Sequence, residues 1–134
     1  MKRNSFYLVH LPFILYTILL TVLLVLPSQK LPDVFEVSDK IKHYIAFLVF
    51  AFLFSASFYF KKNISIKLSR IYLLVGLIAS LYGGITEFIQ TFVPGRSGDF
   101  YDLSLDILGA ISGIYLFFLF LKFSKLNFEK IGTK

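Results

Sequence analysis

Residues 71–92 read IYLLVGLIASLYGGITEFIQTF, and this stretch decides the fold class of the chain. It is almost wholly apolar, and at about 1.5 Å per residue a helix of this length covers the ~30 Å hydrocarbon core of a bilayer. Because lipid offers no hydrogen bonds to a backbone, the stretch predicts a membrane-spanning helix. Two features are unusual within it: the pair Gly83-Gly84 and the carboxylic side chain of Glu87.

Three further apolar runs flank this stretch, at residues 6–26, 43–60 and 103–121, and short polar segments separate the four. Hydrophobic residues make up 57% of the 134-residue chain, above the roughly 45–50% typical of soluble domains. There is no cysteine, which excludes disulfides, thiol nucleophiles and thiolate metal sites. We therefore expect an all-α polytopic membrane protein, a single domain over residues 1–134 that forms a bundle of four transmembrane helices.

The first run has two interpretations, because Lys2 and Arg3 precede it as they would precede a signal peptide. Its length and the lack of a small-x-small cleavage site favour a retained anchor helix. The last residues, 127–134, are expected to form an unstructured tail.

The distribution of lysine and arginine predicts the orientation in the cell membrane. One side of the membrane would carry ten of these cations: Lys2, Arg3, Lys61, Lys62, Lys67, Arg70, Lys122, Lys125, Lys130 and Lys134. The other side would carry four: Lys30, Lys40, Lys42 and Arg96. The richer side is expected in the cytoplasm, so both termini would be cytoplasmic. The net charge of +6 does not indicate nucleic-acid binding, because the cations lie dispersed beside apolar runs.

Acidic residues divide the opposite way, and three polar stretches would meet at the outer face. The first is residues 38–44, SDKIKHY, at the start of the second run. Asp39 and His43 are four residues apart and so share a helix face, where a carboxylate can fix the tautomer of an imidazole. A simple helix cap at Ser38 with an interfacial histidine explains the same residues, and both interpretations stay open.

The second stretch is the end of the third run, where Gly83, Glu87 and Gln90 follow an i, i+4, i+7 spacing. A charge inside a membrane helix costs about 2.5–3.5 kcal/mol on insertion scales, so such residues usually face the bundle interior. Snorkelling to the interface is the alternative, although glutamate is short for it and the glycines favour close helix contact.

The third stretch leads into the fourth run, where Asp99 is a candidate cap. Asp102, Asp106, Gly109 and Gly113 follow an i, i+4, i+7, i+11 spacing and form one stripe. The two glycines make a small-xxx-small pattern, so this face should pack on another helix and turn the carboxylates into the bundle. In the alternative interpretation, Asp102 and Asp106 only complement the positive end of the helix dipole.

Charge balance at this face limits its chemistry. One arginine and one histidine, Arg96 and His43, cannot neutralise four carboxylates if all of these groups converge. Some carboxylates would then be protonated, hydrated or bound to a divalent cation. The spacing matches no strong metal motif, so the metal and any cofactor stay unassigned.

Three motifs occur here in a fixed order: Asp-Lys-x-x-His at a helix start, Glu-x-x-Gln followed by Pro-Gly-Arg, and an aspartate at a helix start with a glycine deeper in the helix. Together they resemble the VanZ-like family of bacterial membrane proteins over about residues 38–113. The matching residues are Asp39, Lys40, His43, Glu87, Gln90, Pro94, Gly95, Arg96, Asp102 and Gly109. The family usually carries asparagine four residues after the last aspartate, where this chain has Asp106. The resemblance implies a link to glycopeptide antibiotics, because the family's namesake is associated with teicoplanin resistance, but it implies no reaction.

Three functions fit these observations, and whether the protein is an enzyme stays open. The first is an envelope protein whose outer-face site binds or modifies a membrane lipid, a lipid-linked cell-wall precursor or a glycopeptide. Its candidate acid–base residues are His43, Glu87 and Asp102, and its candidate binding residues are Asp39, Lys40, Gln90, Arg96 and Asp106. The second is a structural or interaction subunit, and the third is a small transporter, which the strongly apolar cytoplasmic halves disfavour.

Overall fold

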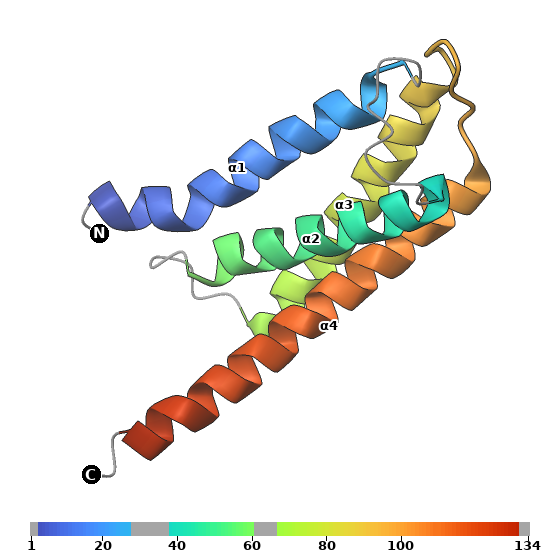
Figure 1. Ribbon diagram of the computed structural model, residues 1–134. Coiled ribbons are helices and arrows are strands. Elements are labelled where there is room, and N and C mark those ends of the chain that lie inside the picture. The colour runs from blue at the N-terminus through green and yellow to red at the C-terminus, as the bar shows by residue number, and fades with distance from the viewer. Residues whose placement is uncertain (1–2, 28–37, 61–66, 132–134) are drawn as a thin grey trace.

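The computed structural model describes residues 3–27, 38–60 and 67–131, and these residues form four helices and no strand. The helices are α1 (Arg3–Val25), α2 (Asp39–Tyr59), α3 (Leu68–Gln90) and α4 (Phe100–Ile131). Consecutive helices run in opposite directions, so the start of α1 and the end of α4 lie at the same end of the bundle (Figure 1). The all-α prediction is confirmed.

Helix boundaries differ from the predicted runs mainly because polar residues join the helix ends. α2 begins at Asp39 rather than at residue 43, and α4 begins at Phe100 rather than at residue 103. The expected unstructured tail is wrong for residues 127–131, because α4 continues to Ile131. No glycine or proline interrupts the chain between Gly113 and Gly132, so nothing in the backbone stops the helix earlier.

The closest helix pair is α2 and α4, and two glycines make it possible. A Cβ atom added at Gly109 would overlap the carbonyl oxygen of Tyr44, and one at Gly113 would overlap that of Leu48. The backbones therefore approach closely along this line, as the predicted small-xxx-small pattern requires. Tyr44 also donates a hydrogen bond to Ser112 Oγ across the same interface, at 2.9 Å.

Aromatic side chains fill much of the rest of the bundle. Phe47 and Phe50 of α2 are buried against Val75 and Ala79 of α3 in one apolar core. α1 joins from the outside, where Phe13 stacks on Phe54 with ring centroids 4.5 Å apart. In the described part of the chain α1 contacts α2 and α3 but not α4.

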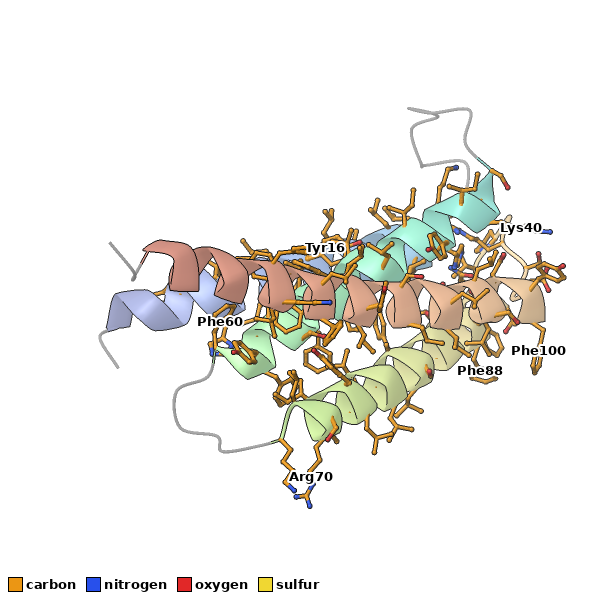
Figure 2. All side chains as sticks on the ribbon, turned by 90° about the horizontal axis from the view of Figure 1, so that it is seen from below. Tyr16, Lys40, Phe60, Arg70, Phe88 and Phe100 are labelled. Carbon is orange, nitrogen blue, oxygen red and sulfur yellow. The ribbon has the colours of Figure 1, made fainter. Side chains whose placement is uncertain are left out.

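The outer surface is itself apolar, and Figure 2 shows side chains extending from every helix. By length and composition three helical segments are suited to crossing a membrane: Asp39–Tyr59, Leu68–Gln90 and Phe100–Ser124. In α1 the apolar segment is shorter, His10–Val25. Exposed side chains such as Leu77 and Leu81, 60% and 65% exposed, need a lipid environment rather than water. The chain is therefore a multi-pass membrane protein; the fourth span and the cytoplasmic placement of both termini stay predictions.

Candidate functional site at the polar end of the bundle

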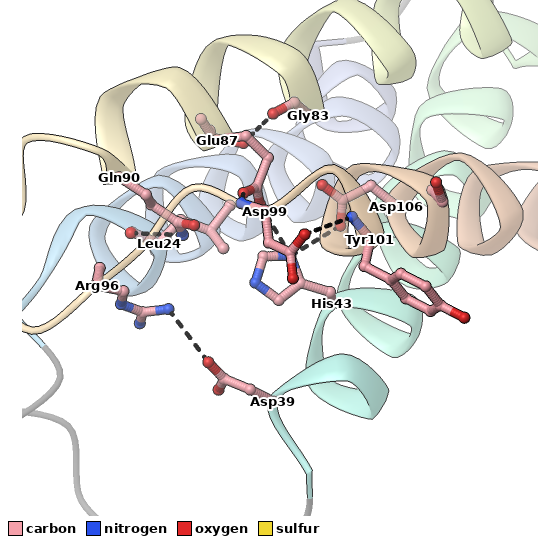
Figure 3. A network of polar contacts seen from close by, with 12 residues as sticks. Leu24, Asp39, His43, Gly83, Glu87, Gln90, Arg96, Asp99, Tyr101 and Asp106 are labelled. Carbon is pink, nitrogen blue, oxygen red and sulfur yellow. Dashed lines mark hydrogen bonds and ion pairs between the residues drawn. The ribbon is translucent and has the colours of Figure 1, made fainter.

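One end of the bundle holds a cluster of ionisable side chains, which we call the polar cluster: His43 of α2, Glu87 of α3 and Asp106 of α4. All three side chains are buried. His43 Nδ1 lies 3.0 Å from Asp106 Oδ1 and 3.6 Å from Glu87 Oε1 (Figure 3). The helices thus bring together three residues that are far apart in the sequence, as the predicted helix faces required.

The loop that leads into α4 holds the Glu87 carboxylate on the side that faces away from His43. The backbone N–H of Asp99 donates a hydrogen bond to Glu87 Oε2, at 2.9 Å. This loop lies so close to α3 that a Cβ at Gly98 would come within 2.7 Å of Thr91 Cγ2. Glycine is therefore required there, and the bond leaves Glu87 Oε1 directed at the imidazole.

Asp106 is the most deeply buried member, with a side-chain exposure of 0%. Gly83 of α3 makes room for it, because a Cβ at that position would lie 3.0 Å from Asp106 Oδ2. Among the described residues Asp106 Oδ2 has no hydrogen-bond partner, and neither has Asp102 Oδ1 one helical turn earlier. The predicted stripe of carboxylates does point inward.

Of the two interpretations left open here, the pairing of Asp39 with His43 is not formed, and Ser38 occupies the N-cap position of α2 without a side-chain hydrogen bond. Asp39 is the first residue of α2 and its side chain is 59% exposed, whereas His43 turns inward to Asp106. Asp39 instead lies 3.4 Å from Lys42 Nζ and 3.9 Å from Arg96. Asp99 does cap α4 as predicted, because its Oδ1 accepts the backbone N–H of Tyr101 at 2.9 Å.

Gln90 and Arg96 lie apart from the polar cluster and bind the end of α1. Gln90 Nε2 donates to the carbonyl of Leu24, and Arg96 donates to the carbonyls of Leu23 and Leu26. The last carbonyls of a helix have no partner within it, so these side chains supply the missing donors. Sequence reasoning did not find this role, because nothing in either motif points to α1.

Lys40 extends over the ring of Tyr101, with its ammonium 4.5 Å from the ring centroid. It therefore lies at the start of α4, on the rim of the polar end. No described contact links it to the polar cluster.

A cavity of about 230 Å³ lies beside Glu87, between the end of α3 and the start of α4. Its wall includes Gly84, Phe88, Gly98, Phe100 and Leu103. Phe88 and Phe100 are also 65% and 87% exposed, so the cavity is open to the surroundings between two apolar rings. The sequence did not predict this cavity, although the missing side chain at Gly84 leaves open space there, since a Cβ at that position would meet no atom within 4 Å.

The polar cluster combines groups that can exchange protons with groups that can bind a cation. One donor atom from each of its three members lies within 4.8 Å of the others. A buried imidazole between carboxylates can serve as an acid–base pair when a substrate reaches it. The same donors fit the ligand types of a divalent metal ion.

Apolar antiparallel helices around a buried acid–histidine cluster define a small polytopic membrane protein with a polar site inside its bundle. The comparison with protein families is more specific, because the model of the VanZ/LLP1 family matches residues 13–121. The chain belongs to the VanZ/LLP1 family, and the predicted resemblance is confirmed. The match includes every member of the polar cluster. No curated protein and no solved structure matches the chain significantly.

Proposed function

We propose that this protein lies in the bacterial cell membrane with both termini in the cytoplasm, and that its polar end faces outward and binds a lipid-linked molecule of the cell envelope. The observation that carries the proposal is the cavity beside Glu87. It joins an opening between apolar rings to a buried polar group, which is the arrangement a ligand with one apolar and one polar part requires.

The walls of the cavity favour an acyl or isoprenoid chain. Phe88, Phe100 and Leu103 supply apolar surface at the opening, and Glu87 lies where a polar head group would arrive. Its carboxylate accepts hydrogen bonds from hydroxyl or ammonium groups. On the rim Lys40 offers a cation to a phosphate. Lipid-linked cell-wall precursors combine these chemical features.

Filling the cavity tests this directly. A Cβ added at Gly84 meets no atom within 4 Å, so Gly84→Leu should occupy the cavity without disturbing the helices. The matched control is Gly76→Leu on the same helix, where an added Cβ makes only an ordinary contact with Ile114 at 3.8 Å. The probe is an isoprenoid phosphate that carries a photoreactive group. We expect labelling near Leu103 in the wild type and in Gly76→Leu, and at least a tenfold loss in Gly84→Leu; equal labelling of all three would contradict the proposal.

The family membership adds a cellular prediction, protection against teicoplanin. A susceptible host would express the wild type, Glu87→Gln or Asp102→Asn, with the membrane abundance of each quantified. Protection by the wild type alone at equal abundance supports a working carboxylate site. Equal protection by all three would mean that these carboxylates have no direct role.

A structural subunit is the second candidate, because Gln90 and Arg96 are both used to fix α1 to the bundle. If variants of the polar end reduce only abundance and never activity per molecule, this candidate is favoured. A transport function has less support, since buried aromatic residues such as Phe47, Phe50 and Phe117 fill the interior beyond the polar cluster.

A further inference from the structure

The polar cluster contains more negative groups than its own imidazole can neutralise. Glu87 and Asp106 are members, and Asp102 lies one turn before Asp106 on the same helix. Three cationic side chains in the described part of this end make other contacts, with an aromatic ring, an exposed carboxylate and α1 carbonyls: Lys40, Lys42 and Arg96. An unneutralised charge is costly inside a membrane, so the cluster must hold protons or a cation.

The unpartnered oxygens favour a cation. A protonated carboxyl group donates its hydrogen to an acceptor, yet Glu87 Oε1 and Asp106 Oδ2 are buried without a hydrogen-bond partner in the part of the chain that is described. The other oxygen of each carboxyl group is already used, by the Asp99 N–H and by His43. Glu87 Oε1 lies 3.6 Å from His43 Nδ1, so a free carboxylate lone pair stands beside an imidazole nitrogen, and both are ligand types that a divalent cation binds.

The distances agree with a coordination sphere. His43 Nδ1 lies 3.0 Å from Asp106 Oδ1 and 3.6 Å from Glu87 Oε1. Two donors that each lie about 2.0–2.2 Å from a single ion are roughly 3–4 Å apart. The three donors come from three different helices, so their spacing is fixed by the packing of the bundle rather than by one flexible segment.

We propose that His43, Glu87 and Asp106 bind one divalent transition-metal ion, of the Zn²⁺ or Mn²⁺ type. An imidazole ligand suits zinc, carboxylates suit manganese, and the set contains no sulfur. On binding, the ion takes the place of the hydrogen bond between His43 Nδ1 and Asp106 Oδ1, and the proton of that bond is released to solvent. The hydrogen bond from the Asp99 backbone orients the Glu87 ligand, as outer-shell partners do in metal sites.

Three protein ligands leave at least one coordination position for water or an anionic oxygen. Glu87 also lines the cavity, so that position would be reached from the cavity. The metal site itself does not depend on which molecule enters there. Its test therefore uses the metal alone.

The experiment measures metal bound by the full chain in detergent, after chelation and dialysis and without a histidine tag. Zn²⁺ and Mn²⁺ are titrated separately by calorimetry, and bound metal is counted by mass spectrometry after removal of free ions. We expect one saturable site in the wild type. Glu87→Gln and Asp106→Asn should each weaken binding at least tenfold, and the variant at 106 installs the amide that the family resemblance leads us to expect in relatives, so it should fold.

Asp39→Asn is the matched control, because Asp39 is a carboxylate at the same end of the bundle but exposed. It should leave the affinity unchanged. Circular dichroism and gel filtration of every variant show whether it is folded. No saturable binding of either metal to the wild type would overturn the site, and so would equal affinities in the folded Asp106→Asn or Glu87→Gln variant.

Discussion

The two ends of the bundle are held together in different ways. At the polar end, His43 joins three helices, because its Nδ1 lies 3.6 Å from Glu87 Oε1 of α3 and 3.0 Å from Asp106 Oδ1 of α4. At the other end, which we call the aromatic end, phenylalanine rings of α2 and α4 interlock, such as Phe52 and Phe117 at 5.7 Å between centroids. Cross-helix hydrogen bonds also occur there, since His10 Nδ1 and Ser57 Oγ are 2.6 Å apart.

This difference shows where specificity and where adaptability lie in the molecule. The hydrophobic burial that holds these rings together is non-directional, so it tolerates a small shift of one ring against another better than a charged contact does. Buried charges need defined partners at defined distances, and a missing partner is costly. We therefore expect the functional site at the polar end, where the distances between side chains are fixed most strictly. The following variants test this comparison of the two ends.

The largest effect is expected where the α2 and α4 backbones touch between the two ends. Gly113→Val places a side chain where the carbonyl of Leu48 lies, so the helices must separate and the alignment of His43 with Asp106 is lost. We expect a loss beyond the ~1–3 kcal/mol typical of overpacking, and little folded protein in membranes. Gly84→Val is the control, because its side chain enters open space. Equal abundance of the two variants would contradict this account.

Removal of the imidazole should have the next largest effect. His43→Leu leaves Glu87 and Asp106 buried without their shared partner, and breaking a buried ion pair in this way costs about 3–5 kcal/mol. The free energy of unfolding is measured by detergent titration. Adding Asp106→Asn to this variant should restore part of the loss, because one of the two carboxylates that lost their partner is removed. A loss under about 1 kcal/mol would show that the cluster behaves like ordinary packing.

Sequence reasoning found the polar cluster because charge inside an apolar run leaves few alternatives. The close helix contact at Gly109 and Gly113 could also be predicted, since small residues at i and i+4 indicate that two helices approach closely. Sequence reasoning left open whether Asp39 contacts His43, and the contact is not formed because Asp39 lies at the exposed start of α2. It also missed the roles of Gln90 and Arg96, whose partners are backbone carbonyls, because carbonyls carry no sequence signal.

The anchoring of α1 gives a smaller effect. Gln90→Leu removes the donor to the Leu24 carbonyl and leaves that oxygen buried without it, which costs about 1–3 kcal/mol. Ser104→Ala serves as the control, because its exposed hydroxyl bonds only to Phe100 of its own helix. Both are measured in the same detergent titration. If Gln90→Leu is no worse than Ser104→Ala, Gln90 does not fix α1.

The smallest effect is expected at Ser55, a fully buried hydroxyl in the half of α2 nearer the aromatic end. Its Oγ donates to the carbonyl of Ala51 in the same helix, at 2.8 Å, and that carbonyl also belongs to the helix's own hydrogen-bond ladder. Ser55→Ala therefore strands no partner on another helix, and we expect a change within about 0.5 kcal/mol. Ser55 and Gln90 are buried to a similar degree, so burial alone predicts similar losses for the two variants. A loss at Ser55 as large as that at Gln90 would mean that any buried polar group matters equally, and the contrast between the two ends would fail. A neutral Ser55→Ala beside a costly Gln90→Leu would show that polar groups stabilise this bundle only where they join one helix to another.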